Sequence, residues 1–266
     1  MGSTTVRGNR EQGLLLTGEQ ASNQQIAFRR GAIQTSGAEG ILAQVTQVGS
    51  QEVTIEDSTI RRSGGDGIRG EAGVLDGSST AAQELFVRRN RILNNGGAGI
   101  SISANEVSAQ EFTIDRNRIQ NNSGDGIRGV VNNVGFQEYV TDASNQSSGI
   151  SNNTITNNGG QGINLEINDT GTLIADIQEN TVSGNAAPAP EIEITAASNT
   201  SDVCVVLVGN TTVRGIELNN NLAGSPALFQ VGNLSTVTIR NQGGVVLQPS
   251  LSSFTDRSGI TSCFEN

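Results

Sequence analysis

Residues 90–100 read NRILNNGGAGI, and this pattern of a branched aliphatic residue, asparagine and closely spaced glycines returns along most of the chain. The clearest further copies begin at Ser58, Asn117 and Asn153. The first branched aliphatic residue of each copy marks the repeat, and these markers are Val6, Ile33, Ile60, Ile92, Ile119, Ile155 and Val182. Successive markers are 27, 27, 32, 27, 36 and 27 residues apart. A recurring period of this length predicts a solenoid in which each repeat forms one turn.

Alternating apolar residues predict three short strands in every turn. One strand ends five residues before the marker, at Phe28, Ile55, Val87, Ile114, Ile150 and Ile177. The marker itself begins a second strand, and apolar pairs such as Ile100 and Ile102 begin a third. Apolar residues at period 2 are typical of strands, and the many glycines and β-branched residues disfavour helix. We therefore expect an all-β fold, a parallel solenoid with three strands per turn of about 27 residues.

Glycine and asparagine fill fixed places in the repeat. Glycines between the second and third strands suit sharp bends, because glycine adopts positive φ without steric cost. Two asparagine columns are predicted at bends, one containing Asn90, Asn117, Asn153 and Asn180, the other Asn95, Asn122, Asn158 and Asn185. Stacked asparagines can pass side-chain hydrogen bonds from one turn to the next.

The repeat divides the chain into two predicted parts. Residues 1–195 carry the β-helical repeats, and residues 196–266 are expected to form a cap of longer β-hairpin strands over the last turn. The two longer turns place their extra residues within Glu71–Ala82 and Val131–Ser148. We expect these insertions to project as side loops, with Phe136 and Tyr139 as candidate binding residues in the second.

Composition excludes several classes of partner and chemistry. All 16 basic residues are arginine, histidine is absent, and the net charge is −10. An acidic chain argues against binding to nucleic acid or anionic membranes, and no apolar run is long enough for a transmembrane helix. The repeat is in register as early as Val6, so we expect a segment of a longer, secreted or cell-surface protein without its signal peptide. Cys204 and Cys263 could close a disulfide in the cap, which would require an oxidising compartment; two buried free thiols are the alternative.

The repeats resemble those of right-handed parallel β-helix proteins of the pectin-lyase-like class, including segments of large bacterial surface exoproteins. The resemblance covers about residues 4 to 195 and implies the fold, whereas the class contains lyases, hydrolases, epimerases, phage tailspikes and adhesins, so it leaves the activity open. The signatures of three of its enzyme groups are missing here, since the chain has no histidine, no adjacent Asp-Asp pair and no counterpart of the lyases' calcium-binding aspartates.

Three carboxylates are weak catalytic candidates. Glu39, Asp66 and Asp125 all lie six residues after a marker. Glycosidases need two carboxyl groups about 5 to 9.5 Å apart. Glu39 and Asp66 would lie one turn apart, near the lower limit, and Asp125 two turns from Asp66, about 10 Å away. Solvated turn residues are the alternative interpretation. Calcium-binding nonapeptide rolls repeat every nine residues, so we expect neither a metal site nor a cofactor.

Charged residues after the first strand form two further columns. The first column is Arg29, Glu56, Arg88 and Asp115, and the second is Arg30, Asp57, Arg89 and Arg116. Opposite charges stacked at strand spacing can pair along an outer face. The alternative is an arginine-rich groove for an acidic glycan, with Arg88, Arg89, Arg91, Arg116 and Arg118 as its wall.

The sequence therefore supports two principal hypotheses of different classes. The first is a non-catalytic structural or adhesive β-helix segment that contacts polysaccharide through its side loops. The second is a carbohydrate-active enzyme, a polysaccharide hydrolase or lyase. An excised or engineered scaffold module is a third, and the oligomeric state stays open.

Overall fold

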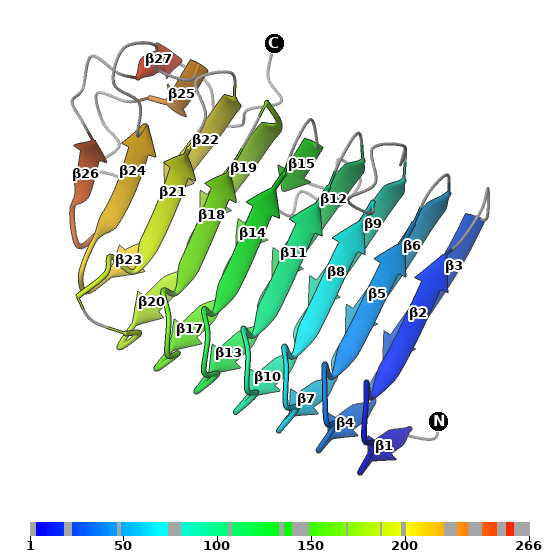
Figure 1. Ribbon diagram of the computed structural model, residues 1–266. Coiled ribbons are helices and arrows are strands. Elements are labelled where there is room, and N and C mark those ends of the chain that lie inside the picture. Colours follow the sequence, from blue (N-terminus) through cyan, green and yellow to red (C-terminus); the bar gives the residue numbers. More distant parts are fainter. Residues whose placement is uncertain are drawn as a thin grey trace.

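The strands of the chain build one elongated solenoid, and no described segment is helical (Figure 1). The computed structural model describes residues 4–18, 23–46, 49–73, 81–105, 108–132, 136–139, 149–168, 170–186, 188–197, 201–220, 228–233, 241–248 and 254–257. The described strands form three sheets, each of which takes one strand from every complete turn. The predicted all-β parallel solenoid with three strands per turn is confirmed.

The three sheets differ in strand length. Sheet A consists of β1 (Thr5–Arg7), β4 (Ala32–Gln34), β7 (Thr59–Arg61), β10 (Arg91–Leu93), β13 (Arg118–Gln120), β17 (Thr154–Thr156), β20 (Thr181–Ser183) and β23 (Thr211–Thr212). Sheet B consists of β2 (Leu14–Gly18), β5 (Ile41–Val45), β8 (Ile68–Ala72), β11 (Ile100–Ala104), β14 (Ile127–Val131), β18 (Ile163–Ile167), β21 (Ile192–Ala196), β24 (Ile216–Asn220) and β26 (Val245–Gln248). Sheet C consists of β3 (Asn23–Arg29), β6 (Ser50–Glu56), β9 (Ala82–Arg88), β12 (Ala109–Asp115), β15 (Phe136–Tyr139), β16 (Ile150–Ser151), β19 (Thr172–Gln178), β22 (Asp202–Val208), β25 (Leu228–Gly232) and β27 (Thr255–Arg257).

The repeat markers stack in a single file within sheet A. Each marker pairs in register with the marker of the next turn, from Val6 opposite Ile33 to Ile155 opposite Val182. All of them except Val6 are completely buried, in one continuous core that also receives the inward residues of sheets B and C. Burying each branched aliphatic side chain contributes about 1.5–3 kcal/mol, so the repeated marker supplies both the register and much of the driving force.

Buried asparagines connect the turns at the bend between sheets C and A. Asn117 donates through Nδ2 to the Val87 carbonyl at 2.7 Å and to Asn153 Oδ1 at 3.1 Å. Its own Oδ1 accepts the backbone N–H of Asn90 at 2.9 Å. The same arrangement recurs from Ser58 to Asn241. Backbone groups that the bend removes from the sheets are thereby satisfied inside the protein.

A second asparagine ladder follows sheet A, as the sequence predicts, and it stops at a glutamate. Asn95, Asn122, Asn158 and Asn185 are linked in the same way. Beyond Asn185 the next turn has no asparagine in this column, and the completely buried Glu191 accepts the Asn185 amide at 2.5 Å instead. Arg214 neutralises Glu191 at 3.3 Å and also donates to the Ala189 carbonyl.

A third ladder, of glutamines, closes the corner between sheets B and C. Gln51 donates to Gln24 at 3.2 Å, Gln83 to Gln51 at 2.9 Å and Gln110 to Gln83 at 3.1 Å. Gln83 also reaches the Ala43 carbonyl of sheet B at 3.0 Å. The sequence analysis missed this ladder because glutamine in an alternating strand is ordinarily read as an outward residue.

The bends require unusual backbone conformations. The residue before the buried bend position between sheets C and A has a positive φ, between 52° and 55° at Arg30, Asp57, Arg89, Arg116, Asn152 and Glu179 and 67° at Gly209. At Gly99 the requirement is space: a Cβ there would lie 2.3 Å from Ile119 Cγ2 and 2.6 Å from the Gly126 carbonyl oxygen. Glycine in this column lets each turn lie directly on the next.

The described strands after residue 196 continue the parallel pairing. β22 pairs with β19 and β25, β24 with β21 and β26, and β25 with β27, all in parallel. These segments therefore do not form the expected β-hairpins. The division at residue 195 and the capping role stay predictions. Cys204 lies in β22, whereas Cys263 lies outside the described residues, so the predicted Cys204–Cys263 bridge also stays a prediction.

The second insertion begins later than the sequence indicates. Phe136 and Tyr139 belong to β15, which pairs with β12 and β19, and they do not lie in a projecting loop. The strand resumes at β16, so the inserted residues interrupt sheet C between Tyr139 and Ile150. The side chains of Phe136 and Tyr139 lie outside the description, as do residues 74–80 of the first insertion.

We expect Asn117→Ala to destabilise the chain by about 2–4 kcal/mol, because it leaves buried donors and acceptors of the neighbouring turns unpaired. Urea unfolding followed by circular dichroism measures the change. Thr154→Ala on the exposed side of β17 is the control and should stay within about 0.5 kcal/mol. An equal loss in both variants would contradict the importance of the ladder.

Candidate functional site

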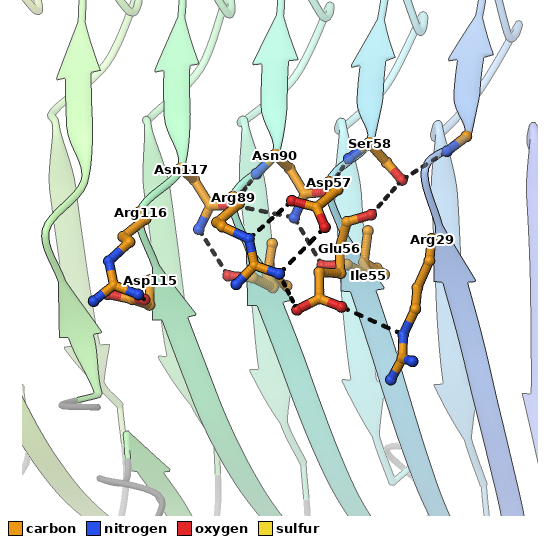
Figure 2. Close-up of polar contacts among 12 residues, drawn as sticks. Arg29, Ile55, Glu56, Asp57, Ser58, Arg89, Asn90, Asp115, Arg116 and Asn117 are labelled. Atoms are coloured by element: carbon orange, nitrogen blue, oxygen red, sulfur yellow. Dashed lines mark hydrogen bonds and ion pairs between the residues drawn. The ribbon is translucent and has the colours of Figure 1, made fainter. Parts of the chain in front are cut away.

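Ion pairs occupy much of the bend between sheets C and A. Figure 2 shows Arg89 reaching back across one turn to Asp57, with Nε 2.8 Å from Oδ1, and to Glu56. Glu56 also pairs with Arg29 of the preceding turn at 3.4 Å. Arg116 lies 3.4 Å from the buried Asp115. The hydrogen bond from Arg89 holds the pKa of Asp57 below its ordinary value, and Asp57 raises the pKa of Arg89 in turn.

The five arginines of the predicted wall do not lie together on one surface. Arg89 and Arg116 are ion-paired, and the Arg88 guanidinium stacks over Phe86, 4.9 Å from the ring centroid. Arg91 and Arg118 lie instead on the outer side of sheet A, where both are exposed and paired in register. Opposite charges of neighbouring turns therefore form ion pairs, as the sequence predicts. On the side of the following turn, however, Glu56 pairs with Arg89 and not with Arg88 of its own column.

A hollow of about 770 Å³ lies over the outer face of sheet B and collects two of the three candidate carboxylates. Asp66 and Asp125 line it, with Arg69, Arg128 and Asn164. Its walls come from the turns and strands around β8, β11, β14 and β18, so four successive turns contribute. A hollow of this size fits a small molecule or a few sugar units.

The carboxylates in and beside this hollow bind neighbouring turns. Asp66 Oδ1 accepts the backbone N–H of Ala98 at 2.7 Å, and Asp125 Oδ1 accepts that of Gln161 at 2.7 Å. Glu39 lies outside the hollow lining and faces Arg69 at 3.5 Å. Each carboxylate thus supports the following turn, a role that explains why acidic residues recur at this place.

Burial raises the pKa of Asp66, although the Ala98 N–H and the charges of Arg69 and Arg128 oppose the rise. A raised carboxyl pKa is a property of general acids, and buried structural carboxylates share it. Since Asp66 and Asp125 are two turns apart, strand spacing places them about 10 Å from each other, at the upper limit of the glycosidase range.

Acidic residues form a column on the outer face of sheet C. Glu52, Glu84 and Glu111 pair in register on β6, β9 and β12. Partial loss of hydration and then repulsion from Glu111 and Glu52 raise the pKa of Glu84. Like charges placed directly opposite one another on adjacent strands destabilise a sheet.

Two absences hold for the described part of the chain. No group of three or more histidine, cysteine, aspartate or glutamate side chains there could hold a metal ion. The same residues include no helix long and apolar enough to cross a membrane.

Comparison with known families gives one match, which spans almost the whole chain. The family described as "Right handed beta helix region" matches residues 1–265. The chain belongs to this family. No curated protein and no solved structure matches it. The family match includes the residues predicted to form a cap, in agreement with the parallel pairing of β22 to β27 in this β-helix.

We expect Glu84→Gln to stabilise the β-helix by a few tenths of a kcal/mol at neutral pH, because it removes the charge from the centre of the glutamate column. A raised pKa in the folded state means that stability is highest below the unfolded value and falls as pH rises through the folded value. The Tm of the parent should therefore decline more steeply than that of Glu84→Gln as pH rises from the ordinary glutamate range.

Thermal melts at several pH values and fixed ionic strength measure this difference. Glu11→Gln removes the same charge outside the column and should leave the slope unchanged. Parallel Tm profiles for the parent and Glu84→Gln would contradict the proposed repulsion.

Proposed function

We propose that the chain is a non-catalytic structural or adhesive segment of a secreted or cell-surface β-helix protein. The observation that carries this proposal is the engagement of the candidate catalytic carboxylates. One carboxylate oxygen of Asp66 and one of Asp125 each accept a backbone N–H of the next turn, at 2.7 Å in both cases. Asn164 also approaches the second oxygen of Asp125, at 3.4 Å. Carboxylates held in this way connect turns, and the spacing of the pair, about 10 Å, lies at the upper limit for glycosidic cleavage.

The internal organisation supports the same role. One large apolar core and the polar ladders extend through successive turns, so the chain forms a rod whose length grows with every repeat. Nearest-neighbour stacking of this kind suits spacing and display. The glycan contacts that the sequence predicts for the two insertions, within Glu71–Ala82 and Val131–Ser148, remain part of the proposal.

A carbohydrate-active enzyme is the second candidate, favoured by the hollow over sheet B. Its lining combines Asp66, whose pKa burial raises, with arginines that could neutralise an acidic sugar. In that case Asp66 would act as general acid, and Arg69 and Arg128 would orient the substrate.

Replacement of Asp66 distinguishes the two roles. In a structural role Asp66→Asn keeps an acceptor for the Ala98 N–H and loses a charge that burial disfavours, so stability should hold or rise. Asp66→Ala leaves the Ala98 N–H without its acceptor and should cost about 1–2 kcal/mol. Chemical denaturation of the three proteins measures the order.

Turnover provides the complementary test. We expect the purified chain to release no reducing ends and no unsaturated uronate from a panel of neutral and acidic polysaccharides. Depolymerisation that disappears in folded Asp66→Asn or Asp125→Asn would overturn the non-catalytic role and establish the enzyme.

A further inference from the structure

The outer face of sheet A is the one sheet surface that carries arginines without carboxylates among the described residues. Its outward positions are Thr5, Arg7, Ala32, Gln34, Thr59, Arg61, Arg91, Leu93, Arg118, Gln120, Thr154, Thr156, Thr181, Ser183 and Thr211. We call this surface the basic face. The acidic groups of a chain with net charge −10 must therefore lie elsewhere, for example on sheet C at Glu52, Glu84 and Glu111.

Among the described residues, the arginines of the basic face have no carboxylate partner, whereas other arginines of this chain do. Arg29, Arg69 and Arg89 each pair with a carboxylate. In the described part of the chain, by contrast, neither Arg91 nor Arg118 forms an ion pair. Arg118 donates to its neighbour Gln120 at 2.6 Å, and Arg61 to Gln34 at 3.1 Å.

Two arginines of the basic face are stacked along the solenoid axis, and two more lie beside them on the same sheet. Arg91 and Arg118 are direct partners on β10 and β13, one strand spacing of about 4.8 Å apart. Arg61 lies on β7, the strand before β10, where it pairs in register with Leu93 and is therefore two residues along the strand from the Arg91–Arg118 column, and Arg7 lies on β1. Directly opposed like charges destabilise a sheet, and an anion placed between them removes that repulsion. A linear ligand that presents negative groups along the axis could engage several turns at once.

From this geometry we propose that the basic face binds a linear acidic polysaccharide along the solenoid axis, with Arg61, Arg91 and Arg118 as the principal contacts. Guanidinium groups bind carboxylate or sulfate through paired hydrogen bonds. Gln34, Gln120 and the threonines of the later turns offer donors and acceptors for sugar hydroxyls. The inference goes beyond the proposed function, because it concerns another sheet than the hollow and holds whether or not the chain has catalytic activity.

One feature of sheet A favours a polysaccharide over nucleic acid. No aromatic residue occupies a described outward position of sheet A, and binding of single strands depends on stacking of bases on aromatic side chains.

The test measures binding of the whole chain to immobilised polygalacturonate by biolayer interferometry at two salt concentrations, with neutral dextran as the comparison surface. The double variant Arg91→Gln/Arg118→Gln should lose about tenfold or more in affinity and show weaker salt dependence. Arg29→Gln/Arg116→Gln removes the same total charge from arginines that are already ion-paired, and should stay within about twofold.

Folding is verified from the Tm of each variant. Should the glutamine double variant unfold, Arg91→Lys/Arg118→Lys keeps the charge, loses the paired hydrogen bonds and should bind measurably less tightly.

Equal losses in the basic-face and control variants, equal binding to dextran, or tighter binding to single-stranded DNA than to polygalacturonate would overturn the proposal. So would a dimer in analytical ultracentrifugation that dissociates in Arg91→Gln/Arg118→Gln, because the face would then bind a second copy. Turnover is recorded separately, so failure of binding and failure of the non-catalytic role give different results.

Discussion

Every turn of this protein must satisfy polar backbone groups at bends that are buried between stacked layers. The asparagine side chain meets this requirement because one amide can donate downward to a carbonyl and upward to the next amide while its oxygen accepts a backbone N–H. Asn117 makes all three kinds of contact. A turn displaced by one residue would lose all three hydrogen bonds together. The asparagine ladders therefore fix the register of the turns, as the stacked repeat markers of sheet A also do.

The ends of the ladders show what the constraint demands when asparagine is missing. Ser58 begins one ladder by giving its backbone N–H to Asn90 at 2.9 Å, and its hydroxyl accepts the N–H of Gly31. Glu191 ends the other by accepting the amide of Asn185, and its buried charge is offset by Arg214. A buried carboxylate is tolerable only with such a partner.

The same stacking distributes charge over the surface. A residue type repeated at one position of the period becomes a column at strand spacing, so a modest preference in sequence becomes a continuous strip in space. Glutamates collect on sheet C, arginines without carboxylates on sheet A, and mixed pairs at the bend between these sheets. Binding properties of such a solenoid therefore belong to faces, whereas an enzyme concentrates them at one point.

The sequence alone determined the period, the isoleucine file and the two asparagine columns, because these residues recur at positions that only a stacked parallel coil brings together. It also identified the arginines but could not tell which were neutralised, since Arg88, Arg89 and Arg91 are neighbours in the chain and point to different surroundings. Only the tertiary structure assigned Arg89 to Asp57, Arg88 to Phe86 and Arg91 to the basic face. It also turned Gln51, Gln83 and Gln110 into a buried ladder and continued the parallel strands past residue 196. The physical reason is that most of these partners, such as Asp57 for Arg89 and Gln51 for Gln83, lie one turn away, and bends and insertions set which side chains meet there.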